Sequence, residues 1–167
     1  MQKHYDDIIY LTEAFVPFIL KNQDLDFDSF HYGGCVIPHK GFSEPVEVAK
    51  CIDTLLSLYY NQNSIYYQNS EFLQRIVVFL ENLLKEQHED GTLDLKETNF
   101  HDATATAFAI QSLAYTYRLL QKYSQGSQYE NKISKLLLTF TRRSGEGMRL
   151  GGFHTPNHRW VMASALS

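Results

Sequence analysis

Apolar residues spaced at intervals of three and four constrain the fold of this chain more than any other feature. In the segment 69–88 such residues fall on one face of a helix. They are Phe72, Ile76, Phe79, Leu80 and Leu83. The same spacing recurs through most of the 167 residues. It predicts helices near 4–22, 44–61, 69–88, 102–124, 128–143 and 156–167. Pro17 is expected to kink or shorten the first of them.

The connections between these helices alternate between long and short. The second, fourth and sixth helices follow long connections that contain glycine, namely "DFDSFHYGGCVIPHKGFS", "EDGTLDLKETNFH" and "GEGMRLGGFHT". The other two, "NQNSIYYQ" and "SQGSQ", are shorter and polar. The three helices that follow long connections begin roughly 55 residues apart, which indicates a repeated two-helix unit. In a row of antiparallel hairpins, all three long loops should then lie at one end.

These patterns predict an all-α protein in which three helical hairpins form an incomplete α/α toroid, with residues 1–167 as a single domain. The alanines and threonines of 102–124 would let neighbouring helices approach closely, so we expect this helix in an inner position. Binding and catalytic residues are often displayed on loops held by a rigid scaffold. The end that carries the long loops is therefore the predicted functional end.

Composition narrows the classes of partner. The net charge of −4 gives no general attraction to nucleic acid or to anionic membranes. No apolar run approaches the roughly 18 residues of a membrane span, and the acidic start "MQKHYDDIIYLTEAF" is unlike a signal peptide. We therefore expect a cytoplasmic protein with no nucleic-acid or membrane partner. Cys35 and Cys51 lack metal-site spacing and are expected to be free thiols.

Polar side chains gather at the predicted functional end. Histidine exchanges protons near neutral pH, so histidines in neighbouring loops are candidates for proton transfer. The candidate site residues are Tyr32, Asn99, His101, His154, Asn157, His158 and Arg159. From Arg142 to Arg159 there are four arginines and one glutamate, a local charge of +3 that would attract an anion.

Helix capping explains part of this composition. Ser43, Asp102 and Thr155 followed by Pro156 suit helix starts. Capping does not explain His101 or the polar residues 157–159. His154 and His158 are four residues apart, but the helix begins between them, so we predict no metal site and no cofactor. Tyrosines 59, 60, 66 and 67 could form a sugar-stacking surface, although core or rim packing is the favoured interpretation.

Two motifs resemble a known family. The segments "DGTLDLKETNFHDATATAF" and "GGFHTPNHRWVMASAL" resemble the α/α-toroid portion of bacterial heparinase II/III-like polysaccharide lyases. The resemblance is clearest over residues 90–167, and in such lyases a β-sandwich domain follows the toroid. With three hairpins where related toroids have more, the chain is expected to be a truncated member or a fragment.

The resemblance implies β-elimination from an acidic, uronic acid polysaccharide. Asn157 and Arg159 would hold the uronate carboxylate, the arginine through its bidentate fork. His101 or His158 would be the base that removes the C5 proton. The remaining roles that the family implies are two. Asn99 or His154 would orient the sugar, and the acid would be a tyrosine, either Tyr32 or one from the β-sandwich domain of such lyases.

Two other functions remain open. A glycoside hydrolase of the same fold needs two carboxylates facing one cleft, and Asp90, Asp94 and Asp102 could supply them. A non-catalytic module would instead bury its open toroid face against a partner, a homodimer being the commonest solution.

Overall fold

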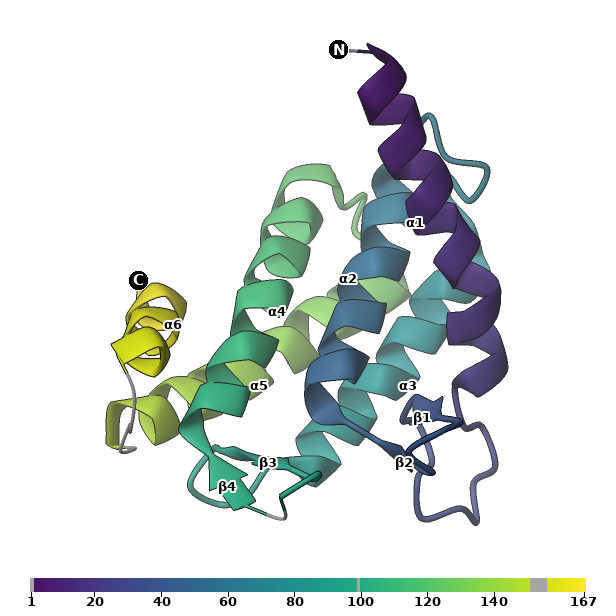
Figure 1. Cartoon of the computed structure of the whole chain (residues 1–167). Helices are drawn as coiled ribbons and strands as arrows, with labels where there is room; N and C mark the ends of the chain where they lie inside the picture. Colours follow the sequence, from purple (N-terminus) through teal and green to yellow (C-terminus); the bar gives the residue numbers. More distant parts are fainter. Residues whose placement is uncertain (1, 99, 151–155) are drawn as a thin grey trace.

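The structure is a computed structural model that describes residues 2–98, 100–150 and 156–167. Within these residues the chain is mostly helical, with six helices packed against one another (Figure 1). The helices are α1 (Gln2–Asn22), α2 (Pro45–Tyr60), α3 (Ser70–Glu86), α4 (Ala103–Tyr123), α5 (Gln128–Leu150) and α6 (Pro156–Leu166). Two antiparallel hairpins complete the fold. They are β1 (Val36–Ile37) with β2 (Phe42–Ser43), and β3 (Leu93–Leu95) with β4 (Phe100–Asp102).

The predicted helices are confirmed, and their limits agree within two residues except at the end of α5. That helix continues to Leu150, seven residues past the predicted limit of 143. Its last turns bury Ser144 and Met148, which compensates for the two glycines that made this segment resemble a loop. Of the two effects expected of Pro17, a kink or a shortening of α1, the structure excludes the shortening, because the helix continues through Pro17 to Asn22.

The hairpins are the main departure from an all-α fold. Both lie inside long connections that the sequence analysis treated as loops. A mostly helical fold is confirmed, whereas a toroid is not shown by the packing of these helices.

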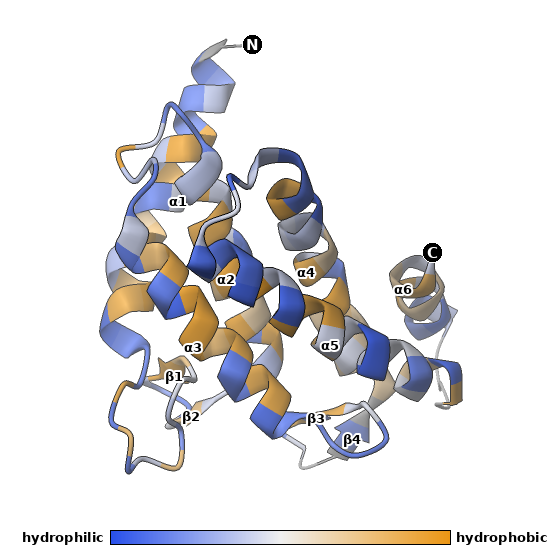
Figure 2. Ribbon diagram, turned by 180° about the vertical axis from the view of Figure 1, so that it is seen from behind, coloured by the Kyte–Doolittle hydropathy of each residue, from blue (hydrophilic) through white to orange (hydrophobic). Residues whose placement is uncertain are grey.

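Helix α4 occupies the inner position that its composition predicts. It packs against α2, α5 and α6, and its buried residues are mainly alanine and threonine. Figure 2 shows both polar and apolar residues along α3 and α5, so each of these helices has one face for the core and one for solvent. The largest fully buried side chains are Ile52, Leu55, Leu56, Phe72, Ile76, Phe79, Leu80, Leu83, Leu93, Leu113, Leu120 and Phe140.

The first two long connections lie at one end of the bundle, as predicted, and the two short links lie at the other (Figure 1). Lys40 of the first connection forms an ion pair with Glu97 of the second. Six of the eleven residues of the third connection, 145–150, form the end of α5, and the other five lie outside the described residues. However, Arg143 of α5 donates a hydrogen bond to the His88 carbonyl at 3.1 Å, so the C-terminal part of α5 also reaches this end.

None of the helices in the described ranges is long and apolar enough to cross a membrane.

Candidate functional site

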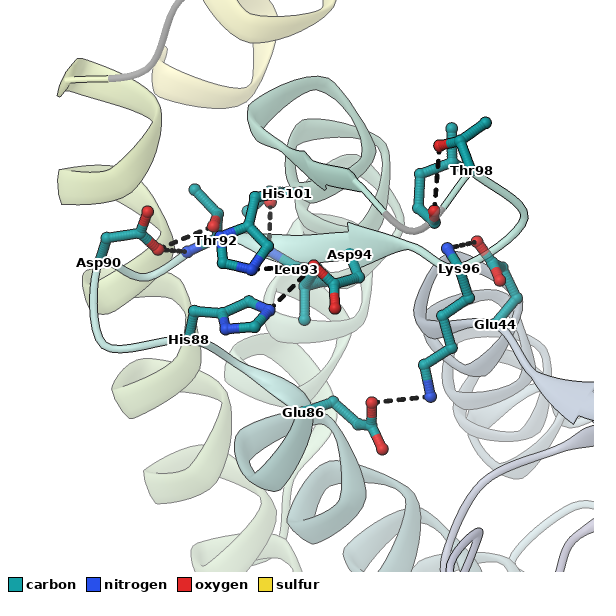
Figure 3. A network of polar contacts seen from close by, with 12 residues as sticks. Glu44, Glu86, His88, Asp90, Thr92, Leu93, Asp94, Lys96, Thr98 and His101 are labelled. Carbon is teal, nitrogen blue, oxygen red and sulfur yellow. Dashed lines mark hydrogen bonds and ion pairs between the residues drawn. The ribbon is translucent and has the colours of Figure 1, made fainter.

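The β3–β4 hairpin holds a cluster of two histidines and one aspartate. Asp94 on β3 pairs directly with His101 on β4 in the antiparallel register. Paired residues project from the same face of a hairpin, so their side chains meet. His88 comes from the turn that follows α3 and reaches the same carboxylate (Figure 3). We call His88, Asp94 and His101 the His–Asp–His cluster.

The three side chains converge on one oxygen atom. Oδ1 of Asp94 lies 2.9 Å from Nε2 of His88 and 3.3 Å from Nε2 of His101. The two imidazole rings stack, with centroids 3.6 Å apart and planes at 33°. The side chains of His88, Asp94 and His101 are 33%, 27% and 57% exposed. The cluster therefore lies at the surface, and His101 is its most accessible member.

These contacts allow two kinds of chemistry. When the carboxylate accepts a hydrogen bond from Nε2–H of His101, the Nδ1 atom of that neutral ring is left as a proton acceptor. An imidazole oriented by a carboxylate is a common arrangement for a general base. Alternatively, one nitrogen of each imidazole and one carboxylate oxygen, which all lie within 4.8 Å of one another, could bind a metal ion together.

The turn before β3 is closed by its own side chains. Asp90 accepts hydrogen bonds from both the backbone N–H and the hydroxyl of Thr92, at 2.9 and 2.7 Å. These bonds favour the ionised carboxylate and hold the pKa of Asp90 below its ordinary value. Gly91 has a φ of 87°, and a Cβ there would meet the backbone of Arg143. The turn is thus fitted against α5.

Buried contacts attach β3 to the helices on both sides. The backbone N–H of Leu93 donates to the buried hydroxyl of Thr106 on α4, at 2.8 Å. The backbone N–H of Lys96 donates to Glu44 at 3.1 Å, and its ammonium group forms a 2.7 Å ion pair with Glu86 (Figure 3). Burial raises the pKa of Glu44 more than the hydrogen bond from Lys96 lowers it. The strand that carries Asp94 is therefore held at both ends.

The structure brings only His101 of the predicted site into this cluster. Asn99 and His154 lie outside the described residues. Tyr32 lies in the connection before β1, where its ring meets Phe27 edge-on at 5.2 Å and its carbonyl accepts a hydrogen bond from Asn82 of α3. Its local environment is therefore that of α3 and the first connection.

The other predicted site residues begin α6. Asn157 and Arg159 are exposed, and His158 is partly buried. Nδ1 of His158 is buried and has no hydrogen-bond partner within the described part of the chain. Helix α6, which belongs to the second lyase-like motif, packs against α4, which begins in the first. The two motifs are therefore connected through the contact between these helices.

One of the three predicted helix caps, Ser43 at the start of α2, is wrong. Glu44 is the N-cap residue of α2 and makes no side-chain cap, whereas the Ser43 hydroxyl accepts a hydrogen bond from the Cys35 backbone at 2.9 Å. The backbone of Asp102 ends β4 directly before α4, and its side chain is outside what is described. Pro156 begins α6 as expected, and Thr155 lies in an undescribed segment.

Sequence reasoning missed His88 as a functional residue because it fell inside a predicted helix. Asp94 was considered only as a carboxylate for glycoside hydrolysis. The one available signal is the alternation in "TLDL", where leucines at every second position indicate a strand that carries Asp94.

Other sequence predictions are tested away from the cluster. Cys35 and Cys51 are free and buried, as expected. Tyr59, Tyr60 and Tyr66 are partly buried against the core, which confirms the packing interpretation for these three. Two of them also line a pocket of about 630 Å³ at the end with the short links, together with Tyr67.

No family model, curated protein or solved structure matches the chain. The likeness to heparinase II/III-like lyases therefore stays a prediction based on two sequence motifs.

Proposed function

We propose that this chain is the helical part of a polysaccharide lyase that binds an acidic, uronic acid oligosaccharide at the end carrying the long connections. The observation that carries the proposal is the exposed His101 imidazole, with Nε2 on the Asp94 carboxylate. The guanidinium group of Arg143, which lies against the His88 backbone, also supports it, because it places a positive charge near this end.

In the proposed reaction, Nδ1 of His101 accepts the C5 proton of the uronate. The electron pair left at C5 forms the C4–C5 double bond, the bond from C4 to the leaving oxygen breaks, and that oxygen takes up a proton from solvent water. Asn157 and Arg159 would neutralise the uronate carboxylate, which makes the C5 proton more acidic. Asp94 would act as a positioning residue that fixes the tautomer of His101. His158 is the alternative base.

An ultraviolet assay tests the proposal, since the unsaturated uronate product absorbs where the substrate does not. The protein should be incubated with pectate, alginate, hyaluronan and heparan sulfate. With one of them we expect product, and His101→Ala should lower its rate by roughly 100-fold or more. Glu97→Gln is the matched control, because the exposed Glu97 lies on the same hairpin and forms an ion pair with Lys40 rather than with the cluster.

The conservative variant Asp94→Asn separates a positioning role from general damage to the fold. It should lower kcat more than it changes KM, because the asparagine retains the shape but can stabilise the wrong tautomer of His101. If no uronic acid polymer is cleaved or bound by the wild-type protein, the proposed function is wrong.

A second candidate, a self-associating interaction module, is favoured by the outer face of α1. Ile8, Leu11 and Phe15 are 61–64% exposed and, together with Phe18, follow helical spacing along one face. Monomers rarely expose such continuous apolar surface. We propose that two copies associate through this face. Sedimentation should show a dimer for the wild-type protein and a monomer for Phe15→Glu; a wild-type monomer at high micromolar concentration would contradict this.

A further inference from the structure

We propose that the His–Asp–His cluster is a binding site for a divalent transition-metal ion, with Zn²⁺ as the preferred ion. The inference rests on the geometry of these three side chains. It does not depend on the carbohydrate proposal, since a metal site here would have meaning for a binding protein as well as for an enzyme.

The spacing of the ligand atoms fits a shared ion. Zinc lies about 2.0–2.2 Å from imidazole nitrogen and carboxylate oxygen, so ligand atoms around a tetrahedral zinc are roughly 3.3 Å apart. The two measured separations from Asp94 Oδ1 are 2.9 Å to His88 and 3.3 Å to His101. The third pair, one ring nitrogen from each histidine, lies within 4.8 Å. Small side-chain rotations would bring all three atoms within bonding distance of one shared zinc ion.

The donor set selects the kind of ion. Two imidazoles and one carboxylate suit zinc, cobalt, nickel or copper, whereas Mg²⁺ and Ca²⁺ prefer sites made of oxygen atoms. Three protein ligands leave a fourth position of the tetrahedron for water or a substrate oxygen. The 57% exposure of the His101 side chain leaves this position open to solvent.

The hairpin holds the ligands in place before an ion arrives. The β3–β4 register fixes Asp94 opposite His101, and the Asp90–Thr92 hydrogen bonds close the turn that presents His88. The ammonium group of Lys96, two residues after Asp94, forms its ion pair with Glu86. The carboxylate of Asp94 therefore interacts with the two imidazoles rather than with Lys96, which directly follows β3.

A simpler explanation is a carboxylate that accepts one hydrogen bond from each imidazole without an ion. The two explanations differ in a measurable way, because only a metal site requires all three side chains for tight, stoichiometric ion binding. The observation that favours the metal site is that a nitrogen of each imidazole and the carboxylate oxygen all lie within 4.8 Å of one another, which a shared ion requires and two separate hydrogen bonds do not.

The test is direct titration of the chelator-treated full chain. Isothermal calorimetry with Zn²⁺ should give one site per chain, and Co²⁺ should give the visible absorption bands of a tetrahedral complex. His88→Ala, Asp94→Asn and His101→Ala should each weaken binding by more than the roughly 10- to 100-fold typical of residues that only support a ligand. His4→Ala, a change to an exposed histidine on α1, should leave the affinity unchanged.

Circular dichroism should first confirm that each variant is folded. The proposal is overturned if the wild-type chain binds neither ion at one equivalent, or if the double variant His88→Ala/His101→Ala binds as tightly as the wild type. Stoichiometric zinc without cleavage of any uronic acid polymer would retain this site and reject the lyase. If the chain cleaves a uronic acid polymer, does so unaffected by chelation and binds no zinc, the lyase proposal is retained and the metal site is rejected.

Discussion

Substitution of Gly147 by alanine tests how α5 supports the candidate site. A Cβ at this position would lie 2.5 Å from the carbonyl oxygen of Asp90 and 3.1 Å from the carbonyl carbon of Gly91. Both atoms belong to the backbone of the turn before β3 and cannot rotate away. Gly145, two residues earlier in the same helix, is the matched control, because a Cβ there would meet nothing within 4 Å.

The two substitutions share one favourable effect and differ in one unfavourable effect. Alanine is favoured over glycine inside a helix by about 0.8–1.0 kcal/mol, so Gly145→Ala should increase the free energy of unfolding by up to about 1 kcal/mol. Gly147→Ala gains the same amount, but forcing atoms into a packed contact costs about 1–3 kcal/mol. Gly147→Ala should therefore be less stable than Gly145→Ala by about 1–3 kcal/mol. It should also be less stable than the wild type whenever the packing cost exceeds the helix gain of about 1 kcal/mol.

Urea unfolding followed by far-ultraviolet circular dichroism measures this difference at unchanged m-value. Because the displaced turn presents His88, Gly147→Ala should also weaken zinc binding, whereas Gly145→Ala should not. Equal stabilities of the two variants would refute the close packing of α5 on the turn and, with it, our explanation of why this helix reaches Leu150.

Two further predictions concern buried hydrogen bonds. Thr106→Val leaves the buried N–H of Leu93 without its acceptor and should lower the free energy of unfolding by about 1–3 kcal/mol. Thr106→Ser keeps the hydroxyl acceptor and should retain most of the wild-type stability. Burial raises the pKa of Glu130, but hydrogen bonds from the Tyr60 hydroxyl and the Ser127 backbone outweigh it and hold the pKa below its ordinary value. The ionised Glu130 therefore stabilises the fold above the ordinary carboxyl pKa, and this stability is lost as the pH falls through the lowered pKa. Glu130→Gln should be less stable than the wild type at pH 6, and urea unfolding should show this difference shrink between pH 6 and pH 3. A deficit that stays constant over this range would contradict the assignment.

The candidate site could be predicted from the sequence only in part. The location of the first two long connections at one end followed from their alternation with short links, and His101 was among the residues selected. His88 and Asp94 were not assigned to a site with His101, because the pairing of β3 with β4 depends on cross-strand register rather than on helical spacing. Tyr32 was grouped with His101 because both lie in long connections and the family resemblance implies a tyrosine acid, whereas the contacts of Tyr32 are with Phe27 and Asn82.

The sequence by itself determined the helices, because helix formation depends on side chains three and four residues apart and these are visible in the order of residues. Only the tertiary structure decided where α5 ends and which side chains share an oxygen of Asp94. Those outcomes depend on contacts between distant segments, such as Gly147 against Asp90 and Arg143 against His88. Such contacts override local preference, since close packing of a turn on a helix can stabilise a helical segment that contains two glycines.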